Sequence, residues 1–250
     1  MEWIDVNCRG GSARDHAAGT PTVAQLLEEM DRLQISEACV HSPWSEVMAA
    51  DHANEQLFED LVPHDRLHAI PEVLPEGGQH FIDKQADAIE DLISKGAIAA
   101  VARLSKNKFP LTPWCAGAML EAMQAARFPL TVFYPEIDPN HLNETLEAFP
   151  ELPILLQEIP RTGYNRIVYA LMAKHKNLRL VCDPPQFVLA GIEYLVNRLG
   201  PDQLLWGTRY PISEGGSAIA GIMYADVSDA AKEAIANGNI KRLMEEVRRG

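Results

Sequence analysis

Eight short β-rich runs alternate with amphipathic helical segments along the whole chain, and this alternation constrains the fold more than any other feature. The runs are 3–8, 38–43, 67–74, 97–105, 130–136, 154–160, 178–184 and 204–210. Several of them are almost continuously apolar, as parallel strands are when helices cover their outer side. Eight such units within 250 residues predict one α/β domain, residues 1–250, folded as a closed (β/α)8 TIM barrel. A doubly wound open sheet is the alternative, but Gly10-Gly11 does not match the phosphate-binding turn GxGxxG.

The segments between the runs carry the helical period. Three sets of apolar residues have it: Val23, Leu26, Leu27, Met30 and Leu33; Ile82, Ile89, Leu92 and Ile93; Ile192, Leu195, Val196 and Leu199. Thr20-Pro21 predicts a capped start for the first of these helices, and Gly200 predicts the end of the last. The tail from Ser228 to Arg248 is predicted to form two helices broken at Gly238.

The amino-acid composition indicates which partners and which cellular compartment to expect. There are 22 Lys and Arg against 35 Asp and Glu, so the formal charge of −13 disfavours nonspecific binding to nucleic acid or to an anionic membrane. We expect neither a signal peptide nor a membrane span. The four cysteines are widely spaced and form no CxxC pair, which favours reduced thiols and a cytoplasmic protein. A homo-oligomer is compatible with these features.

Five stretches, in order, resemble the amidohydrolase-related family of metal-dependent hydrolases, in its decarboxylase-like and lactonase-like branch. They are Ile4–Arg9, Ala53–Glu55 with Pro63–Leu67, Phe149–Leu156, Gly207–Pro211 and Gly238–Leu243. Gly207-Thr208-Arg209-Tyr210-Pro211 is similar to the family's closing signature GSDYP, but Arg209 stands where the signature has an aspartate. The resemblance implies a TIM barrel with its site at the carboxyl ends of the strands.

The same resemblance implies that the family's metal ligands are replaced in this chain. Their positions correspond to Asn7, Arg9, Phe133 or Tyr134, Glu158 and Arg209. A guanidinium has no lone pair to give a metal, and two of them would repel a cation, so we expect no metal and no other cofactor. Arg9 and Arg209 with Glu158 carry the same net charge of plus one as a zinc ion with one aspartate. We therefore expect Glu158 to lie between the two arginines.

With the residues at the strand ends, the resemblance then implies a metal-independent hydrolase that acts on a small anionic molecule, a carboxylate or a lactone. Arg9, Arg103, Arg209 and Asn7 are the candidate substrate-binding residues, and Glu158 is the candidate base, assisted by His41 or Tyr134. Arg103 is alternatively a solvent-facing arginine, and His41 a structural histidine. Cys8 and Cys182 are interpreted as packing residues.

Two further functions are compatible with the sequence. If the arginines and Glu158 only pair with one another, the protein is a non-catalytic pseudoenzyme or a ligand-binding barrel. Carboxylates at other predicted strand ends, Glu72, Glu136 and Asp183, alternatively predict an oxygen-rich site for Mg²⁺ or Mn²⁺. Glu136 and Asp183 are equally interpreted as caps of the helices that follow them.

Overall fold

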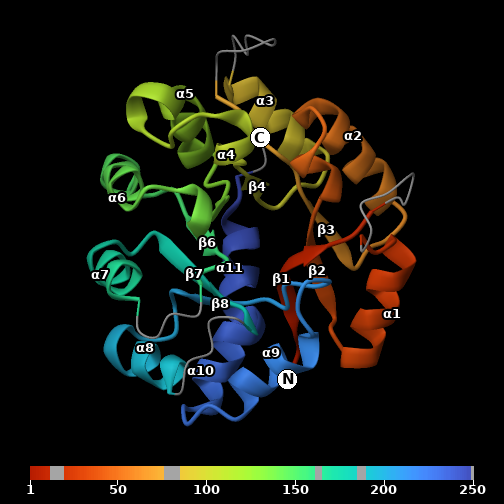
Figure 1. Cartoon of the computed structure of the whole chain (residues 1–250), viewed down its shortest axis with the longest axis vertical. Helices are drawn as coiled ribbons and strands as arrows, with labels where there is room; N and C mark the ends of the chain where they lie inside the picture. The colour runs from red at the N-terminus through yellow and green to blue at the C-terminus, as the bar shows by residue number, and fades with distance from the viewer. Residues whose placement is uncertain (12–19, 76–84, 161–164, 185–189, 249–250) are drawn as a thin grey trace.

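Strands and helices alternate through the chain, as the sequence predicts (Figure 1). The computed structural model describes residues 1–11, 20–75, 85–160, 165–184 and 190–248. The strands are β1 (Ile4–Arg9), β2 (Glu37–His41), β3 (Leu67–Ile70), β4 (Ala100–Val101), β5 (Leu130–Phe133), β6 (Ile154–Gln157), β7 (Leu178–Cys182) and β8 (Leu204–Trp206). The helices are α1 (Val23–Leu33), η1 (Pro43–Glu46), α2 (Ala50–Leu61), α3 (Gln85–Ser94), α4 (Leu104–Asn107), α5 (Pro113–Ala125), η2 (Tyr134–Glu136), α6 (Pro139–Ala148), α7 (Arg166–Lys174), α8 (Gly191–Leu199), α9 (Gly215–Met223), α10 (Asp229–Glu233), η4 (Ala234–Gly238) and α11 (Asn239–Glu246).

All paired strands are parallel, and they close on themselves. Strands β1 to β3 form one ladder and β4 to β8 another. Parallel bridges join the two ladders on both sides, at Cys8 with Tyr210 and at Glu72 with Val101. Backbone hydrogen bonds complete the joins, including Arg9 N–H to the Tyr210 carbonyl at 2.9 Å. The chain is therefore a (β/α)8 barrel, and the open-sheet alternative is wrong.

Each predicted strand is found, and all except β1, which ends one residue later than predicted, end earlier than the predicted runs do. The run 97–105 contains only two strand residues because α4 begins at Leu104, and the run 130–136 ends at Phe133 because η2 follows. At these points the chain turns away at the carboxyl ends of the strands, which places short helical turns around the barrel mouth.

Helix boundaries follow the predicted periodicity with two corrections. Thr22, rather than Thr20, caps α1, and its hydroxyl and the Gln25 side chain form a reciprocal capping box. Gly238 does not break the tail, because the π-helical turn η4 runs directly into α11 with Gly238 in the right-handed region. Gly200 ends α8 at a φ of 80°, as predicted. Ile82 lies outside the described residues.

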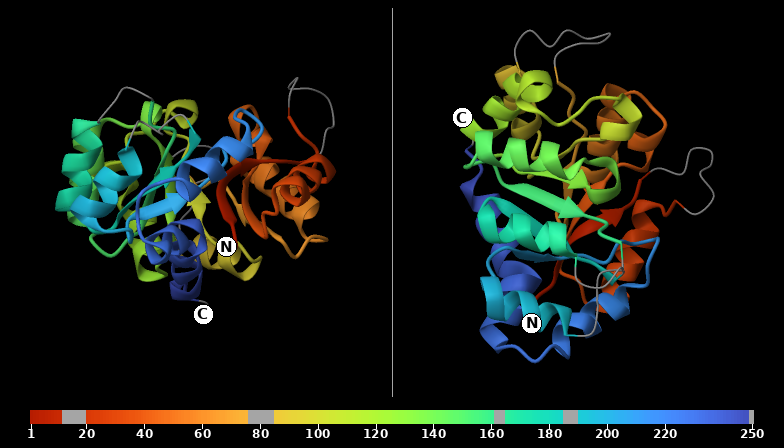
Figure 2. Two further views of the ribbon diagram at one scale, coloured as in Figure 1. Left: turned by 90° about the horizontal axis from the view of Figure 1, so that it is seen from below. Right: turned by 60° about the vertical axis from the view of Figure 1, so that its left-hand side comes forward.

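The apolar core has an inner and an outer part. The outer part lies between the strands and the helices, and the inner part fills the barrel. Ile240 and Leu243 of α11 pack into the inner part, so α11 closes the amino-terminal end of the barrel. The left view of Figure 2 shows this helix below the barrel. The opposite, carboxyl-terminal end is left for polar side chains. Among the described helices, none is sufficiently long and apolar to cross a membrane.

Candidate functional site at the barrel mouth

A polar layer follows directly above the inner core. Side chains two residues apart on a strand face the same side. Two positions beyond the inner-core residues Cys39, Ile70, Val101, Leu155 and Val181 stand the buried polar residues His41, Glu72, Arg103, Gln157 and Asp183. Along each of these strands, the inward-facing side chains therefore change from apolar to polar over one two-residue step.

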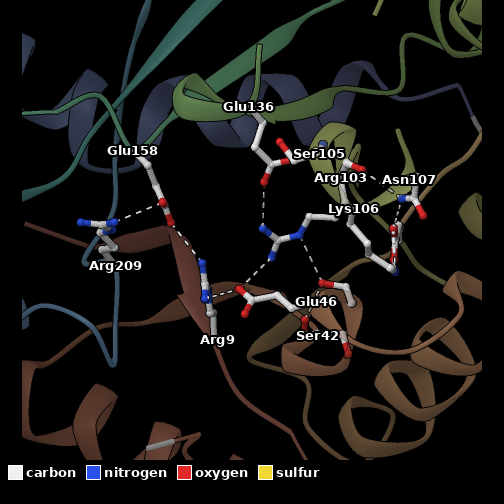
Figure 3. Close-up of polar contacts among 12 residues, drawn as sticks. Arg9, Ser42, Glu46, Arg103, Ser105, Lys106, Asn107, Glu136, Glu158 and Arg209 are labelled. Atoms are coloured by element: carbon white, nitrogen blue, oxygen red, sulfur yellow. Dashed lines mark hydrogen bonds and ion pairs between the residues drawn. The ribbon is translucent and has the colours of Figure 1, made fainter. Parts of the chain in front are cut away.

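Glu158 bridges Arg9 and Arg209, as the sequence predicts (Figure 3). Its Oε1 accepts from Arg9 Nη2 at 3.1 Å, and its Oε2 accepts from Arg209 Nη2 at 3.1 Å. Glu158 and Arg209 both have left-handed backbone, with φ of 58° and 60°. Residues without a glycine's freedom adopt this conformation rarely, and strain of this kind is concentrated at functional sites. The fold holds this bridge at some conformational cost.

A second chain of charges begins at the same Arg9. Its Nη1 donates to Glu46 Oε1 at 2.6 Å, and Arg103 Nη2 lies 3.6 Å from the same oxygen. On its other side, Arg103 Nη1 lies 3.7 Å from Glu136 Oε1. Three guanidiniums and three carboxylates therefore alternate across the mouth, and their formal charges cancel.

Arg103 lies between Glu46 and Glu136 and is buried. The alternative prediction that Arg103 faces solvent is therefore wrong. Its Cζ lies 4.2 Å from the centre of the Phe133 ring, a cation–π contact. Burial lowers the pKa of the Arg103 guanidinium, and the charge of Arg9 adds to this effect, while Glu46 and other carboxylates oppose it. Phe133, which belongs to the inner core, faces the site, whereas Tyr134 packs against the outer core.

Asp183 lies close to Glu158 and Arg209 and is fully buried. Asn7 Nδ2 donates to Asp183 Oδ2 at 3.2 Å. Burial raises the pKa of the Asp183 carboxyl to about 7; Arg209 opposes the rise and the charge of Glu158 reinforces it. Asp183 is therefore the carboxyl group of the mouth whose protonation changes near neutral pH. The alternative role as a cap of the helix that follows depends on residues 185–189, which lie outside the described residues.

His41 ends β2 and is fully buried, with its ring centre 5.8 Å from that of Phe133. Burial, followed by the charges of Arg103 and Arg9, holds the pKa of His41 well below its usual range. Neither ring nitrogen has a hydrogen-bond partner among the described residues. His41 is thus a member of the polar layer whose environment favours the neutral imidazole.

The other strand-end carboxylates have separate partners. Glu72 accepts from Lys106 Nζ at 2.8 Å and from Asn107 Nδ2 at 2.6 Å. Glu136 accepts from the Ser105 backbone N–H at 3.0 Å, which ties it to α4 rather than to the helix that follows it. The described part of the chain contains no group of three or more His, Cys, Asp and Glu residues suited to a metal ion. The Mg²⁺ or Mn²⁺ alternative therefore lacks its ligand cluster.

The sequence prediction did not include Glu46, and it named Asp183 only as a ligand of the alternative Mg²⁺ or Mn²⁺ site or as a helix cap, not as a group of the hydrolase site. Glu46 lies on η1 beyond the end of β2, and its side chain reaches back over the mouth. An acidic residue just after a barrel strand was the available signal. Cys8 and Cys182 are buried, in agreement with their interpretation as packing residues.

Comparison with known proteins identifies the family. A sequence model of the amidohydrolase family matches residues 43–244. The chain belongs to this family. No curated protein sequence matches it. An uncharacterized TIM-barrel protein from Bordetella bronchiseptica has a TM-score of 0.75 at 15% identity, over 99% of both chains.

Two other similar structures have named activities. A candidate 2-pyrone-4,6-dicarboxylic acid hydrolase from Pseudomonas putida has a TM-score of 0.72 at 14% identity, over 98% of this chain and 97% of that one. The 2,6-dihydroxybenzoate decarboxylase from Rhizobium has a TM-score of 0.69 at 12% identity, over 98% and 99%. At these identities the likeness establishes the shared fold alone.

The residues at the family's metal-ligand positions do not fit a metal in this chain. Asn7, Arg9, Glu158 and Arg209 offer one carboxylate, and both of its oxygens already accept from guanidiniums at 3.1 Å. A divalent ion bound there would meet two positive charges and displace both ion pairs. The groups available for chemistry at this mouth are therefore its own side chains.

Proposed function

We propose that this amidohydrolase-family protein is a metal-independent hydrolase of small, carboxylate-bearing esters or lactones. The observation that carries the proposal is Asp183: a buried carboxyl with a pKa of about 7, held by Asn7 close to Glu158 and Arg209. A base with a pKa near neutrality is suited to activating water at neutral pH.

Each group then has a distinct part in the hydrolysis. Ionised Asp183 takes a proton from water as the water oxygen attacks the substrate carbonyl carbon. The resulting oxyanion is stabilised by a guanidinium of the mouth, and the proton held by Asp183 passes to the leaving alkoxide as the carbon–oxygen bond breaks. Glu158, the base that the sequence suggested, already accepts from guanidiniums with both of its oxygens. Its part is to hold Arg9 and Arg209.

The guanidiniums of the mouth and the similar structures both favour an anionic substrate. Guanidiniums bind carboxylates through paired, charge-assisted hydrogen bonds. The named activities of the two structural neighbours, a dicarboxylic acid hydrolase and a dihydroxybenzoate decarboxylase, concern carboxylates as well. This agreement supports the substrate class.

One observation favours a second function, a non-catalytic ligand-binding barrel. Each of Arg9, Arg103 and Arg209 lies within 4 Å of at least one glutamate, so the mouth is electrically balanced without any ligand. A cluster that satisfies itself in this way needs no substrate. Turnover distinguishes the two functions.

The test compares a carboxylate-bearing aryl ester with its neutral counterpart, 4-nitrophenyl hemisuccinate against 4-nitrophenyl acetate, with and without a chelator. We expect faster hydrolysis of the charged ester, no effect of the chelator, and a kcat/KM that rises with pH through about 7. Asp183→Asn should lower kcat by roughly 10²-fold or more. The exposed Asp226→Asn is the matched control. No turnover of either ester, or full activity in Asp183→Asn, would contradict the proposal.

A further inference from the structure

Arg103 is a buried cation with incomplete coordination. A guanidinium has five N–H donors. Its one hydrogen bond among the described contacts runs from Nε to the Ser45 hydroxyl at 3.4 Å, and Nη2 has no hydrogen-bond partner. The carboxylates of Glu46 and Glu136 stand at 3.6 and 3.7 Å, beyond ordinary hydrogen-bond distance. Only 4% of the residue is exposed, so water does not substitute for the missing partners freely.

Phe133 fixes how a partner could reach this cation. The ring lies 4.2 Å from the Arg103 Cζ. The guanidinium therefore offers its N–H donors at its edges, toward Glu46 and Glu136 (Figure 3). A carboxylate that enters in the plane of the guanidinium can accept two parallel hydrogen bonds, the geometry that arginine provides and lysine does not.

The carboxylate of Glu46 itself already lies at one of these edges. A single oxygen, Oε1, lies 2.6 Å from Arg9 Nη1 and 3.6 Å from Arg103 Nη2. The Glu46 side chain is 47% exposed, and it comes from the short turn η1. Glu136 differs, because it is 19% exposed and also accepts from the Ser105 backbone. Glu46 is thus the carboxylate of the pair that can leave the site for solvent at the smaller cost.

We propose that the space between Arg9 and Arg103 is a carboxylate-binding subsite and that Glu46 occupies it as an internal competitor. An incoming carboxylate replaces that of Glu46, which turns to solvent; it takes over the hydrogen bond from Arg9 and binds Arg103 more closely than Glu46 does at 3.6 Å. The exchange keeps the charge balance of the mouth. This inference deepens the anionic substrate class of the proposed function and rests on it, but it concerns binding alone.

The affinity of this subsite is set by how often Glu46 vacates it. A ligand that needs a minor state binds with an apparent affinity reduced by the population of that state. Glu46→Gln removes the competing charge and keeps the shape of the side chain. With a minor state populated at about 10% or less, the variant should bind a carboxylate at least roughly tenfold more tightly than the wild type.

The experiment is calorimetric titration of the whole protein with sodium benzoate at constant ionic strength, with benzamide as the uncharged probe of the same shape. The variants are Glu46→Gln, Glu46→Gln/Arg103→Lys and the control Glu151→Gln. Glu151 is also an exposed glutamate paired with an arginine, Arg127, at 3.3 Å, but it precedes β6 at the other end of the barrel. Arg103→Lys keeps the charge and removes the paired donors, which protects the test against simple loss of folding.

We expect tighter benzoate binding in Glu46→Gln, wild-type affinity in Glu151→Gln, loss of the gain in the double variant, and no gain for benzamide. The inference is overturned if Glu46→Gln binds benzoate within about twofold of the wild type, a difference close to the usual error of such energies. It is overturned as well if neither protein binds benzoate, or if the double variant keeps the gain. Ester turnover without a Glu46 effect would refute this inference only, and benzoate binding without turnover would refute only the hydrolase.

Discussion

Two buried charged residues stand on either side of the short helix α4, and they are coordinated in opposite ways. Glu72 is fully enclosed and accepts from Lys106 and Asn107 over 2.6 to 3.1 Å. Arg103 is almost as deeply buried, but its polar neighbours stand 3.4 to 3.7 Å away. Figure 3 places Lys106 and Arg103 within one view of the barrel mouth.

The difference separates a structural ion pair from a binding site. A buried charge whose hydrogen-bonding capacity is filled fixes the local structure, and breaking it leaves an uncompensated ion. A buried charge with spare donors is costly in isolation and gains most from a ligand. Glu72 anchors α4 and thereby the backbone next to Arg103, while Arg103 keeps an Nη2 that has no hydrogen-bond partner among the described residues.

We expect the largest loss of stability when the ion pair between Glu72 and Lys106 is broken. Lys106→Met removes the cation from a carboxylate with no exposed surface, so the free energy of unfolding should fall by about 3–5 kcal/mol. Replacing both partners, as in Glu72→Met/Lys106→Met, should recover much of that loss, because no charge is left buried. Urea denaturation of the single and double variants checks this. Equal urea midpoints for Lys106→Met and the wild type would mean that Glu72 and Lys106 do not form a structural ion pair.

Breaking the Glu158 bridge should cause an intermediate loss of stability. Glu158→Gln leaves Arg9 and Arg209 without their shared carboxylate, but the three side chains are 13 to 24% exposed. Because water reaches these groups in part, we expect a loss of roughly 1–3 kcal/mol. A high concentration of benzoate should restore part of it by binding in place of the carboxylate. Chloride at equal ionic strength is the control, and an equal rescue by chloride would show simple screening.

Asp183 should give the barrel a pH-dependent stability of unusual sign. Its pKa is about 7 in the folded protein, against about 3.9 in an unfolded chain. Between these values the folded state keeps a proton that the unfolded state has released. The free energy of unfolding should therefore fall as pH rises from about 4 to 7, by up to about 1.4 kcal/mol per unit, and level off above.

Asp183→Asn isolates this contribution from those of the other carboxylates. The difference between its unfolding free energy and that of the wild type should change across this pH range, whereas the difference for Asp226→Asn should stay constant. Denaturant titrations at several pH values measure both differences. A constant difference for Asp183→Asn would mean that its carboxyl titrates as an ordinary aspartate.

The smallest effect is expected at Arg103. Arg103→Met replaces a poorly coordinated buried cation with an apolar chain of similar length, and Glu46 keeps Arg9 as its partner. We expect the free energy of unfolding to change by less than about 1 kcal/mol, since exchanging a weakly satisfied buried charge for a packed side chain is often nearly neutral. A loss as large as that of Lys106→Met would remove the contrast between the two residues.

The sequence determined much of this picture. The alternation of β-rich runs with helical segments places all eight strands, and the family positions place Glu158 between Arg9 and Arg209. Both follow from regularities that extend over many residues. The run Ala97–Val101 is apolar throughout, so it has no alternation from which the inward direction of Arg103 could be predicted.

The remaining features depend on distant segments of the chain. Glu46 reaches the mouth because η1 turns back over the barrel, and no local pattern encodes that path. The raised pKa of Asp183 comes from burial that strands and side chains far apart in the sequence create together. Such properties arise from tertiary packing, which single-sequence patterns do not contain.

The most direct test of the account is the metal content of the protein after incubation with zinc or manganese and desalting, measured by mass spectrometry. The central claim is that guanidiniums and carboxylates replace the metal site of the family at this mouth. A variant with Asn7→His, Arg9→His, Glu158→His and Arg209→Asp restores donors with lone pairs and serves as the positive control. The account predicts far less than about one equivalent of metal in the wild type and clear uptake by the variant. A stoichiometric ion bound among residues 7, 9, 158 and 209 of the wild-type protein would contradict it.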